Sequence, residues 1–145
     1  MEGSAKAAQR GAGPATITVE ELLEDARAGL PRLSPQEAHQ AAAAGAALID
    51  IRSDAQRLED GEIACATHIP RNALEWRLDP ACPHRCPELA RRDLVVIVLC
   101  DEGYQSSLAA ATLRRFGLDA ADVVGGFQAW RAAGLPVERR VLSAG

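Results

Sequence analysis

Residues 94–117 read LVVIVLCDEGYQSSLAAATLRRFG, an apolar run that ends on a cysteine and continues through a short loop into a helical pattern. The run 94–99 is rich in β-branched residues, which is typical of a strand covered on both faces of a parallel sheet. After the loop, Ser106 is a candidate helix N-cap, and Gly117 stands where a left-handed residue would end the helix. We therefore predict a central strand, a turn that carries Cys100, and a helix.

The position of Cys100 at the end of this strand suggests a chemical role. In open α/β sheets ligands bind at the carboxyl ends of strands, where a helix N-terminus presents free N–H groups. A thiol aimed at such a point is favoured as the thiolate, which is the nucleophilic form. The alternative is a plain core residue, because free cysteine is among the most buried residue types.

Four further segments extend the pattern. They are ALIDIR at 47–52, GEI at 61–63, THIP at 67–70 and VVGGFQAWRAAGLPV at 123–137. Together with the cysteine loop, their order and spacing resemble a rhodanese domain over residues 33–137. The resemblance implies an α/β fold of three layers, with a central, mostly parallel sheet flanked by helices. It also implies a single-domain sulfurtransferase, in which Cys100 accepts a sulfane sulfur as a persulfide and passes it to a thiophilic acceptor.

The loop after Cys100 is the expected substrate-binding segment. A thiolate would attack the outer sulfur of a donor such as thiosulfate, and the loop N–H groups would hold the terminal sulfur. The expected donor is therefore a small sulfur-containing anion or a persulfide, and the acceptor is a thiol, cyanide or a protein thiol. No cofactor is expected. The residues of this loop are Asp101, Glu102, Gly103, Tyr104, Gln105 and Ser106.

Three residues outside the loop belong to the same resemblance. Asp50 and Arg52 are implied to form an ion pair that supports the neighbouring loops, although Arg52 could also add positive charge near Cys100. His68 matches a position associated with packing and loop hydrogen bonds. We therefore do not expect His68 to act as a general base.

Two departures from the family pattern keep other functions open. Many members carry an arginine where this chain has Gln105, and Asp101 and Glu102 place carboxylates beside an anion site. A binding or redox-sensing module that uses Cys100 without turnover is therefore the alternative. A phosphatase is disfavoured, because Ser106 stands where the Cys-x5-Arg pattern requires arginine.

The remaining cysteines do not form a complete metal-binding motif. Cys82 and Cys86 enclose His84 in a CPHRC segment, which supplies at most three ligands where structural zinc wants four. No metal site is therefore expected. Either cysteine could instead serve as a resolving thiol for a persulfide, or have no role.

Composition and local patterns indicate the class of protein and the limits of its domain. The chain has 145 residues, 48% of them hydrophobic, and a net charge of −4, which fits one domain and excludes nucleic acid as an evident partner. With no signal peptide and no membrane span in sight, we expect a cytoplasmic protein without a membrane partner. Residues 1–15 are expected to be a disordered tail, 16–31 an N-terminal helical extension that covers the sheet or self-associates, and 32–140 the rhodanese domain.

Local signals place the elements within these boundaries. Thr18 and Glu21 form a capping-box pattern at the start of the extension, and Ser34 followed by Pro35 marks the start of the next helix. Strands are predicted at 47–51, around 67–69, at 94–99 and at 122–124.

Overall fold

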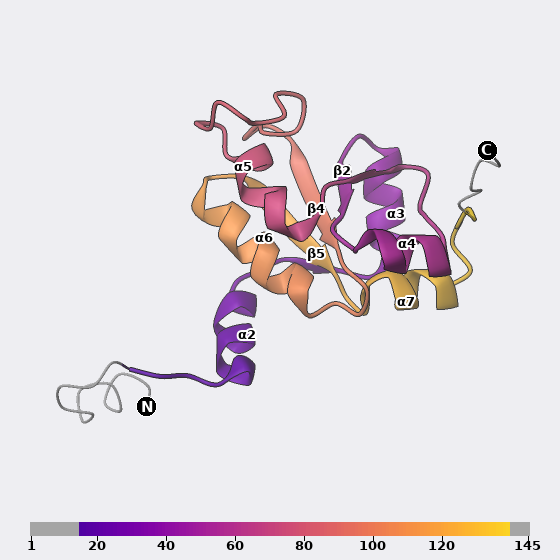
Figure 1. Cartoon of the computed structure of the whole chain (residues 1–145), viewed down its shortest axis with the longest axis horizontal. Helices are drawn as coiled ribbons and strands as arrows, with labels where there is room; N and C mark the ends of the chain where they lie inside the picture. Colours follow the sequence, from indigo (N-terminus) through magenta and orange to yellow (C-terminus); the bar gives the residue numbers. More distant parts are fainter. Residues whose placement is uncertain (1–14, 140–145) are drawn as a thin grey trace.

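The computed structural model describes residues 15–139, so the expected tail at 1–15 lies outside it except for Ala15. Five parallel strands form one sheet in the order β1-β5-β4-β2-β3, with β4 at the centre (Figure 1). This confirms the predicted α/β fold. The strands are β1 Arg32–Leu33, β2 Ala47–Asp50, β3 Ala66–His68, β4 Val95–Leu99 and β5 Asp119–Val123.

Helices cover both faces of the sheet. On one face, the core joins sheet residues to α5 and α6, and on the other it joins them to α3 and α7. A hydrogen bond from Gln128 to Asp60 links α7 to α4. The helices are α2 Val19–Arg27, α3 Pro35–Ala43, α4 Asp54–Asp60, the short 3-10 helix η1 Arg71–Ala73, α5 Leu74–Leu78, α6 Gln105–Arg115 and α7 Gly126–Ala132.

The side chains of β4 alternate between these two cores. Val96 and Val98 lie in the core beneath α5 and α6, whereas Ile97 and Leu99 lie in the core beneath α3 and α7. Successive strand residues point to opposite faces, so Cys100 follows Val98 onto the α6 side. The alternation thus decides which helix the thiol faces.

The N-terminal helix α2 lies on a helix rather than on the sheet. Its contacts are chiefly with α6, none of its residues is buried, and it projects from the body of the molecule (Figure 1). The expectation that this extension covers the sheet is therefore wrong, because α6 already occupies that face. The predicted capping box of Thr18 and Glu21 is present, as is the predicted cap at Ser34.

The strands differ from the sequence prediction by one added strand and by a longer β5, and the bounds of β2, β3 and β4 differ by one residue. β1 was not predicted, and it pairs in parallel with the end of β5. β5 begins at Asp119 rather than at Asp122, because the alanines that follow Asp119 are small enough to be buried between the helices. Within residues 15–139, no helix combines the length and the apolar character that crossing a bilayer requires.

Candidate functional site

The sulfur of Cys100 lies at the carboxyl end of β4 and accepts two backbone hydrogen bonds. The N–H of Gly103 is 3.1 Å from Sγ and that of Ser106 is 3.3 Å away. The side chain is buried, with 6% of its surface exposed. N–H donors aimed at a sulfur stabilise negative charge on it, so this geometry suits a thiolate or a sulfur-bearing anion.

The role of Ser106 differs from the one predicted. Helix α6 begins at Gln105, its N-cap residue is Tyr104, and no side chain caps it. The backbone N–H of Ser106 points at Sγ, and its hydroxyl donates to Asp122 at 2.7 Å. Ser106 is therefore not the N-cap: the first turn of the helix uses its free N–H on the cysteine sulfur instead.

Gly103 gives the loop its shape. It has a φ of 89°, and a Cβ built on it would lie 2.7 Å from the backbone nitrogen of Gly125. Both facts exclude a larger residue without movement of the loop. The start of α7 packs close by, where the N–H of Phe127 donates to the carbonyl of Cys100 at 2.8 Å and that of Gln128 to the carbonyl of Asp101 at 3.0 Å.

Two arginines from the N-terminal part of the chain hold the outer side of this loop. Nη2 of Arg27 donates to the carbonyl of Gly103 at 2.8 Å, and Nη2 of Arg32 donates to the same oxygen at 3.0 Å. In a trans peptide the C=O and the next N–H point in opposite directions, and the chain contains no cis bond in residues 15–139. Holding this carbonyl outward therefore turns the N–H of Tyr104 away from the arginines.

A buried carboxylate supports the loop from below. Asp122 on β5 is fully buried and accepts hydrogen bonds from the hydroxyls of Ser106 at 2.7 Å and Ser107 at 2.8 Å. Arg32 adds an ion pair with Asp122 at 2.9 Å. The network joins β1, β5 and the first turn of α6, so the positions of these three elements decide where the loop N–H groups point.

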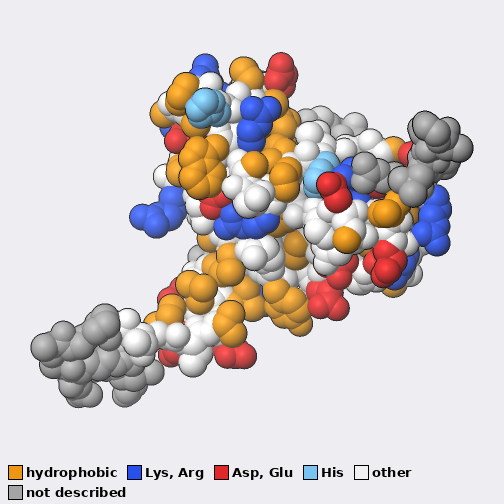
Figure 2. All heavy atoms as spheres, in the orientation of Figure 1, with side chains coloured by type: hydrophobic (Ala, Val, Ile, Leu, Met, Phe, Trp, Pro, Cys, Tyr) orange, Lys and Arg blue, Asp and Glu red, His pale blue; other side chains and the backbone are white. Residues whose placement is uncertain are grey.

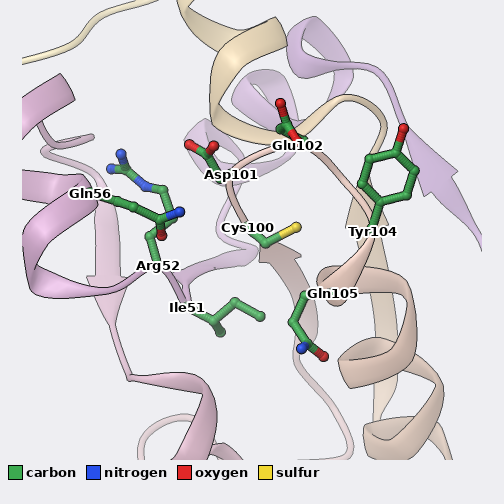
Figure 3. A pocket seen from close by; sticks show the side chains of 8 residues that line it. All are labelled: Ile51, Arg52, Gln56, Cys100, Asp101, Glu102, Tyr104 and Gln105. Carbon is green, nitrogen blue, oxygen red and sulfur yellow. The ribbon is translucent and has the colours of Figure 1, made fainter.

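A cavity of about 250 Å³ opens in front of the sulfur (Figure 3). The predicted loop contributes four of its eight lining residues, and Cys100, α4 and the segment after β2 contribute the others. Gly103 and Ser106, whose N–H groups contact the sulfur, are not among its lining residues. The lining residues are Ile51, Arg52, Gln56, Cys100, Asp101, Glu102, Tyr104 and Gln105.

The two acidic side chains of the loop point away from the sulfur in Figure 3. The Asp101 carboxylate accepts a hydrogen bond from Nε2 of Gln128 at 3.0 Å, and Glu102 is exposed to solvent. Gln105, which replaces the family's arginine, accepts a hydrogen bond from Nε of Arg71 at 3.2 Å. Arg71 is also held by Glu75 at 2.8 Å, so its charge is partly compensated.

Asp50 and Arg52 form the ion pair that the resemblance implied. Their nearest side-chain atoms are 2.8 Å apart, both residues are buried, and Arg52 also donates to the carbonyl of Gly61 at 2.8 Å. The guanidinium carbon lies 3.6 Å from the ring centroid of Phe127. Nε2 of His68 lies 2.7 Å from the carbonyl oxygen of Arg52, which fits the structural role expected of this histidine.

The other cysteines lie apart from this cavity. Cys86 lines a second cavity that shares no lining residue with the first, and its thiol donates to Glu88 at 3.2 Å. Together with a backbone hydrogen bond, which is the larger cause, this contact lowers the pKa of the Glu88 carboxyl. Among residues 15–139, no three His, Cys, Asp or Glu side chains are grouped so that they could hold a metal ion.

Sequence reasoning missed the residues that hold the loop from outside it. Arg27, Arg32 and Gln128 carry no local pattern that links them to Cys100, because they reach it only through the folded chain. Asp122 did offer a signal, since a carboxylate inside the apolar strand β5 needs partners.

Comparisons with known proteins fit this geometry. The family model described as Rhodanese-like domain matches residues 34–133. A thiosulfate sulfurtransferase GlpE from Ectopseudomonas mendocina is 34% identical over 102 residues, which cover 70% of this chain and 84% of the relative.

Two solved structures are also similar. A protein of unknown function from Rhodopseudomonas palustris, described as a possible tyrosine phosphatase, has a TM-score of 0.77 and 33% identity, covering 87% of this chain and 99% of that one. A rhodanese-related protein from Thermoplasma volcanium has a TM-score of 0.60 and 25% identity, and the match covers 74% of this chain and 96% of that one.

Proposed function

Because the chain belongs to the rhodanese-like domain family, we propose that it is a sulfurtransferase that carries a sulfane sulfur on Cys100 as a persulfide. The observation that carries this proposal is the pair of backbone N–H groups, from Gly103 and Ser106, directed at the Cys100 sulfur at the base of an open cavity. Backbone N–H groups directed at a sulfur stabilise negative charge on it, and the open cavity lets a small donor approach.

In the first half-reaction, the thiolate of Cys100 attacks the outer sulfur of the donor. With thiosulfate, a new S–S bond forms at Cys100 while the S–S bond of thiosulfate breaks, and sulfite leaves with the electron pair. The product is a persulfide whose terminal sulfur carries the negative charge. The N–H groups of residues 101–106 would surround that sulfur, since such a concave row of amides binds anions.

In the second half-reaction, a nucleophilic acceptor attacks the terminal sulfur. Cyanide forms thiocyanate, and a thiol forms a new persulfide, while the electron pair of the broken S–S bond returns to Cys100 as the thiolate. No general base is needed if the thiolate is present at the start. Asp50 and Arg52 support the cavity wall in this scheme and take no part in bond making.

The description of one structural relative as a possible tyrosine phosphatase does not extend to this chain. Phosphate-binding loops of that kind use an arginine at the position of Ser106 to grip the phosphate with two hydrogen bonds. Ser106 is fully buried, and its hydroxyl is committed to Asp122 at 2.7 Å. We therefore do not propose phosphatase activity.

A single-turnover experiment tests the proposal. The reduced protein is incubated with thiosulfate, its intact mass is measured, and cyanide is then added. We expect one adduct of about 32 Da, the mass of one sulfur atom formed by covalent transfer, which cyanide removes as thiocyanate. The Cys100→Ala variant should form no adduct, whereas Cys65→Ser, which changes an exposed cysteine, should behave like the wild type.

A different result would favour the alternative function. If Cys100 reacts with iodoacetamide but takes no sulfur from thiosulfate or from glutathione persulfide, the domain is a binding or redox-sensing module. The carboxylates of Asp101 and Glu102 beside the cavity are the features that would suit this alternative.

A further inference from the structure

An apolar groove lies beside the Cys100 cavity, between α2 and the cysteine loop. Its volume is about 420 Å³, and Tyr104 and Gln105 line both hollows. A bound molecule that placed a sulfur at Cys100 could therefore extend into the groove past these two residues. The groove is lined by Val19, Glu20, Leu23, Tyr104, Gln105 and Leu108.

Two apolar or aromatic side chains of the groove lining are strongly exposed. Val19 is 67% exposed and Tyr104 59%. Ile17, two residues before Val19 in the chain, is 55% exposed. Figure 2 shows hydrophobic side chains gathered over α2 and the body next to it, with acidic side chains beside them. Contiguous apolar surface of this kind, rimmed by polar groups, is typical of a site that binds another molecule.

Helix α2 is fixed to the cysteine loop. Arg27, near its end, donates to the carbonyl of Gly103 at 2.8 Å and to the hydroxyl of Ser107 at 3.0 Å. The guanidinium carbon of Arg27 also lies 5.9 Å from the ring centroid of Tyr104. The groove and the sulfur are thus held in one arrangement, although α2 lies outside the residues that the family model matches.

Acidic side chains predominate on the α2 side of the groove, and the nearby cations Arg27, Arg52 and Arg71 are each engaged by a hydrogen bond or an ion pair. Glu20 lines the groove, Glu24 follows one turn later on the same side of α2 as Leu23, and Glu102 lines the Cys100 cavity. Gln105 supplies no positive charge where a small dianionic donor would need it. This pattern opposes thiosulfate and favours a donor that carries positive charge.

We propose that the groove between α2 and the loop docks a basic polypeptide that delivers sulfur as a cysteine persulfide, with an apolar side chain next to that cysteine. The inference rests on the proposed function. The Cys100 thiolate attacks the outer sulfur of the polypeptide's persulfide, and the new S–S bond forms at Cys100. The polypeptide's own S–S bond breaks, its cysteine leaves as a thiolate with the electron pair, and the proton on the outer sulfur stays there.

Synthetic peptide persulfides test this assignment. One peptide carries leucine beside the cysteine and lysines on its flanks, a second has glycine for leucine, and a third has glutamates for the lysines. Glutathione persulfide is the small donor. We expect the first peptide to load Cys100 with a kcat/KM about tenfold or more above the other two, because it gains both apolar burial and charge attraction.

Variants of α2 test whether the groove causes this preference among the peptides. Leu23→Ser should remove the advantage of leucine, and the double variant Glu20→Lys with Glu24→Lys should reverse the order of the lysine and glutamate peptides. Leu23→Ser should not change loading from glutathione persulfide, because Leu23 lies outside the Cys100 cavity. The double variant should not slow this loading, because glutathione persulfide is itself anionic. Asp25→Lys is the matched control, since Asp25 lines a separate hollow on the other side of α2. These changes should leave the fold intact, as α2 buries none of its residues.

The possible failures are distinguishable. If the wild type loads from glutathione persulfide but the three peptides react equally, or if the α2 variants leave their order unchanged, the groove is not a docking site for the donor. If Leu23→Ser changes the sedimentation of the protein and not the peptide order, the groove is an interface between copies of this chain, and the proposal is wrong. If no donor loads Cys100 at all, the proposed function itself fails.

Discussion

Nη2 of Arg27 lies 2.8 Å from the carbonyl oxygen of Gly103, and the N–H of Gly103 lies 3.1 Å from the sulfur of Cys100. One glycine thus connects the N-terminal helix to the sulfur of Cys100. Arg32 donates to the same carbonyl at 3.0 Å, so two cations hold the outer side of the loop. The loop is therefore held partly by Arg27 and Arg32, which lie outside residues 34–133 that the family model matches.

Replacing Arg27 by methionine should weaken sulfur transfer. The variant loses charge-assisted hydrogen bonds to Gly103 and Ser107, and we expect kcat/KM to fall by about tenfold, a difference of about 1.4 kcal/mol in transition-state stabilisation. Steady-state kinetics well below the melting temperature measure this. Arg27→Lys should recover part of the loss, whereas Arg115→Met, on an exposed part of α6, should change nothing. A lower melting temperature with unchanged kinetics would contradict a positioning role for Arg27.

Replacing Gly103 by alanine should abolish most sulfur loading. The new Cβ would lie 2.7 Å from the nitrogen of Gly125 at a φ of 89°, so the loop must move and its N–H groups leave the sulfur. We expect loading to slow by about a hundredfold or more. Gly134→Ala is the matched control, with a φ of 76° and no atom within 4 Å of the added Cβ. It should cost about 1 kcal/mol of stability and leave loading intact; equal effects of the two changes on loading would refute the prediction.

Replacing Gln105 by arginine should favour thiosulfate. The side chain at this position lines the cavity, so a guanidinium there would offset the acidic rim and attract a dianion. We expect the thiosulfate loading rate to rise by about five- to tenfold, and the gain to shrink at high salt. Gln105→Ala should show no such gain. The rate with uncharged iodoacetamide should change less than the rate with thiosulfate, and an equal rise in both would mean that Cys100 itself became more reactive.

Breaking the buried pair of Asp50 and Arg52 should destabilise the fold. Arg52→Met leaves the buried carboxylate of Asp50 without its cation, and we expect the free energy of unfolding to fall by about 3 to 5 kcal/mol. Urea denaturation measures this. The double variant with Asp50→Asn should lose less than the sum of the two single variants, since it leaves no unpaired charge. Additive losses would show that the two side chains do not stabilise each other.

Much of the site was predictable from local sequence. The apolar run before Cys100 predicted the central strand, and the period of two along β4 determines that Cys100 shares a face with Val96 and Val98. The caps at Thr18 and Ser34 were equally predictable from sequence, because each capping box joins residues only three positions apart. Asp50 and Arg52 are two residues apart, which is close enough for their ion pair to be inferred from the family pattern.

The tertiary structure alone decided what surrounds the sulfur. Arg27 and Arg32 precede Gly103 by 76 and 71 residues, and they reach its carbonyl only after β1 has paired with β5. In the folded chain Ser106 is not the predicted helix cap, because its hydroxyl donates a hydrogen bond to Asp122. Sequence by itself therefore determined where the thiol stands in the fold, since strand alternation and caps act over a few residues. The direction of the loop's amides and the groove beside α2 arise from contacts between distant segments, which no local pattern encodes.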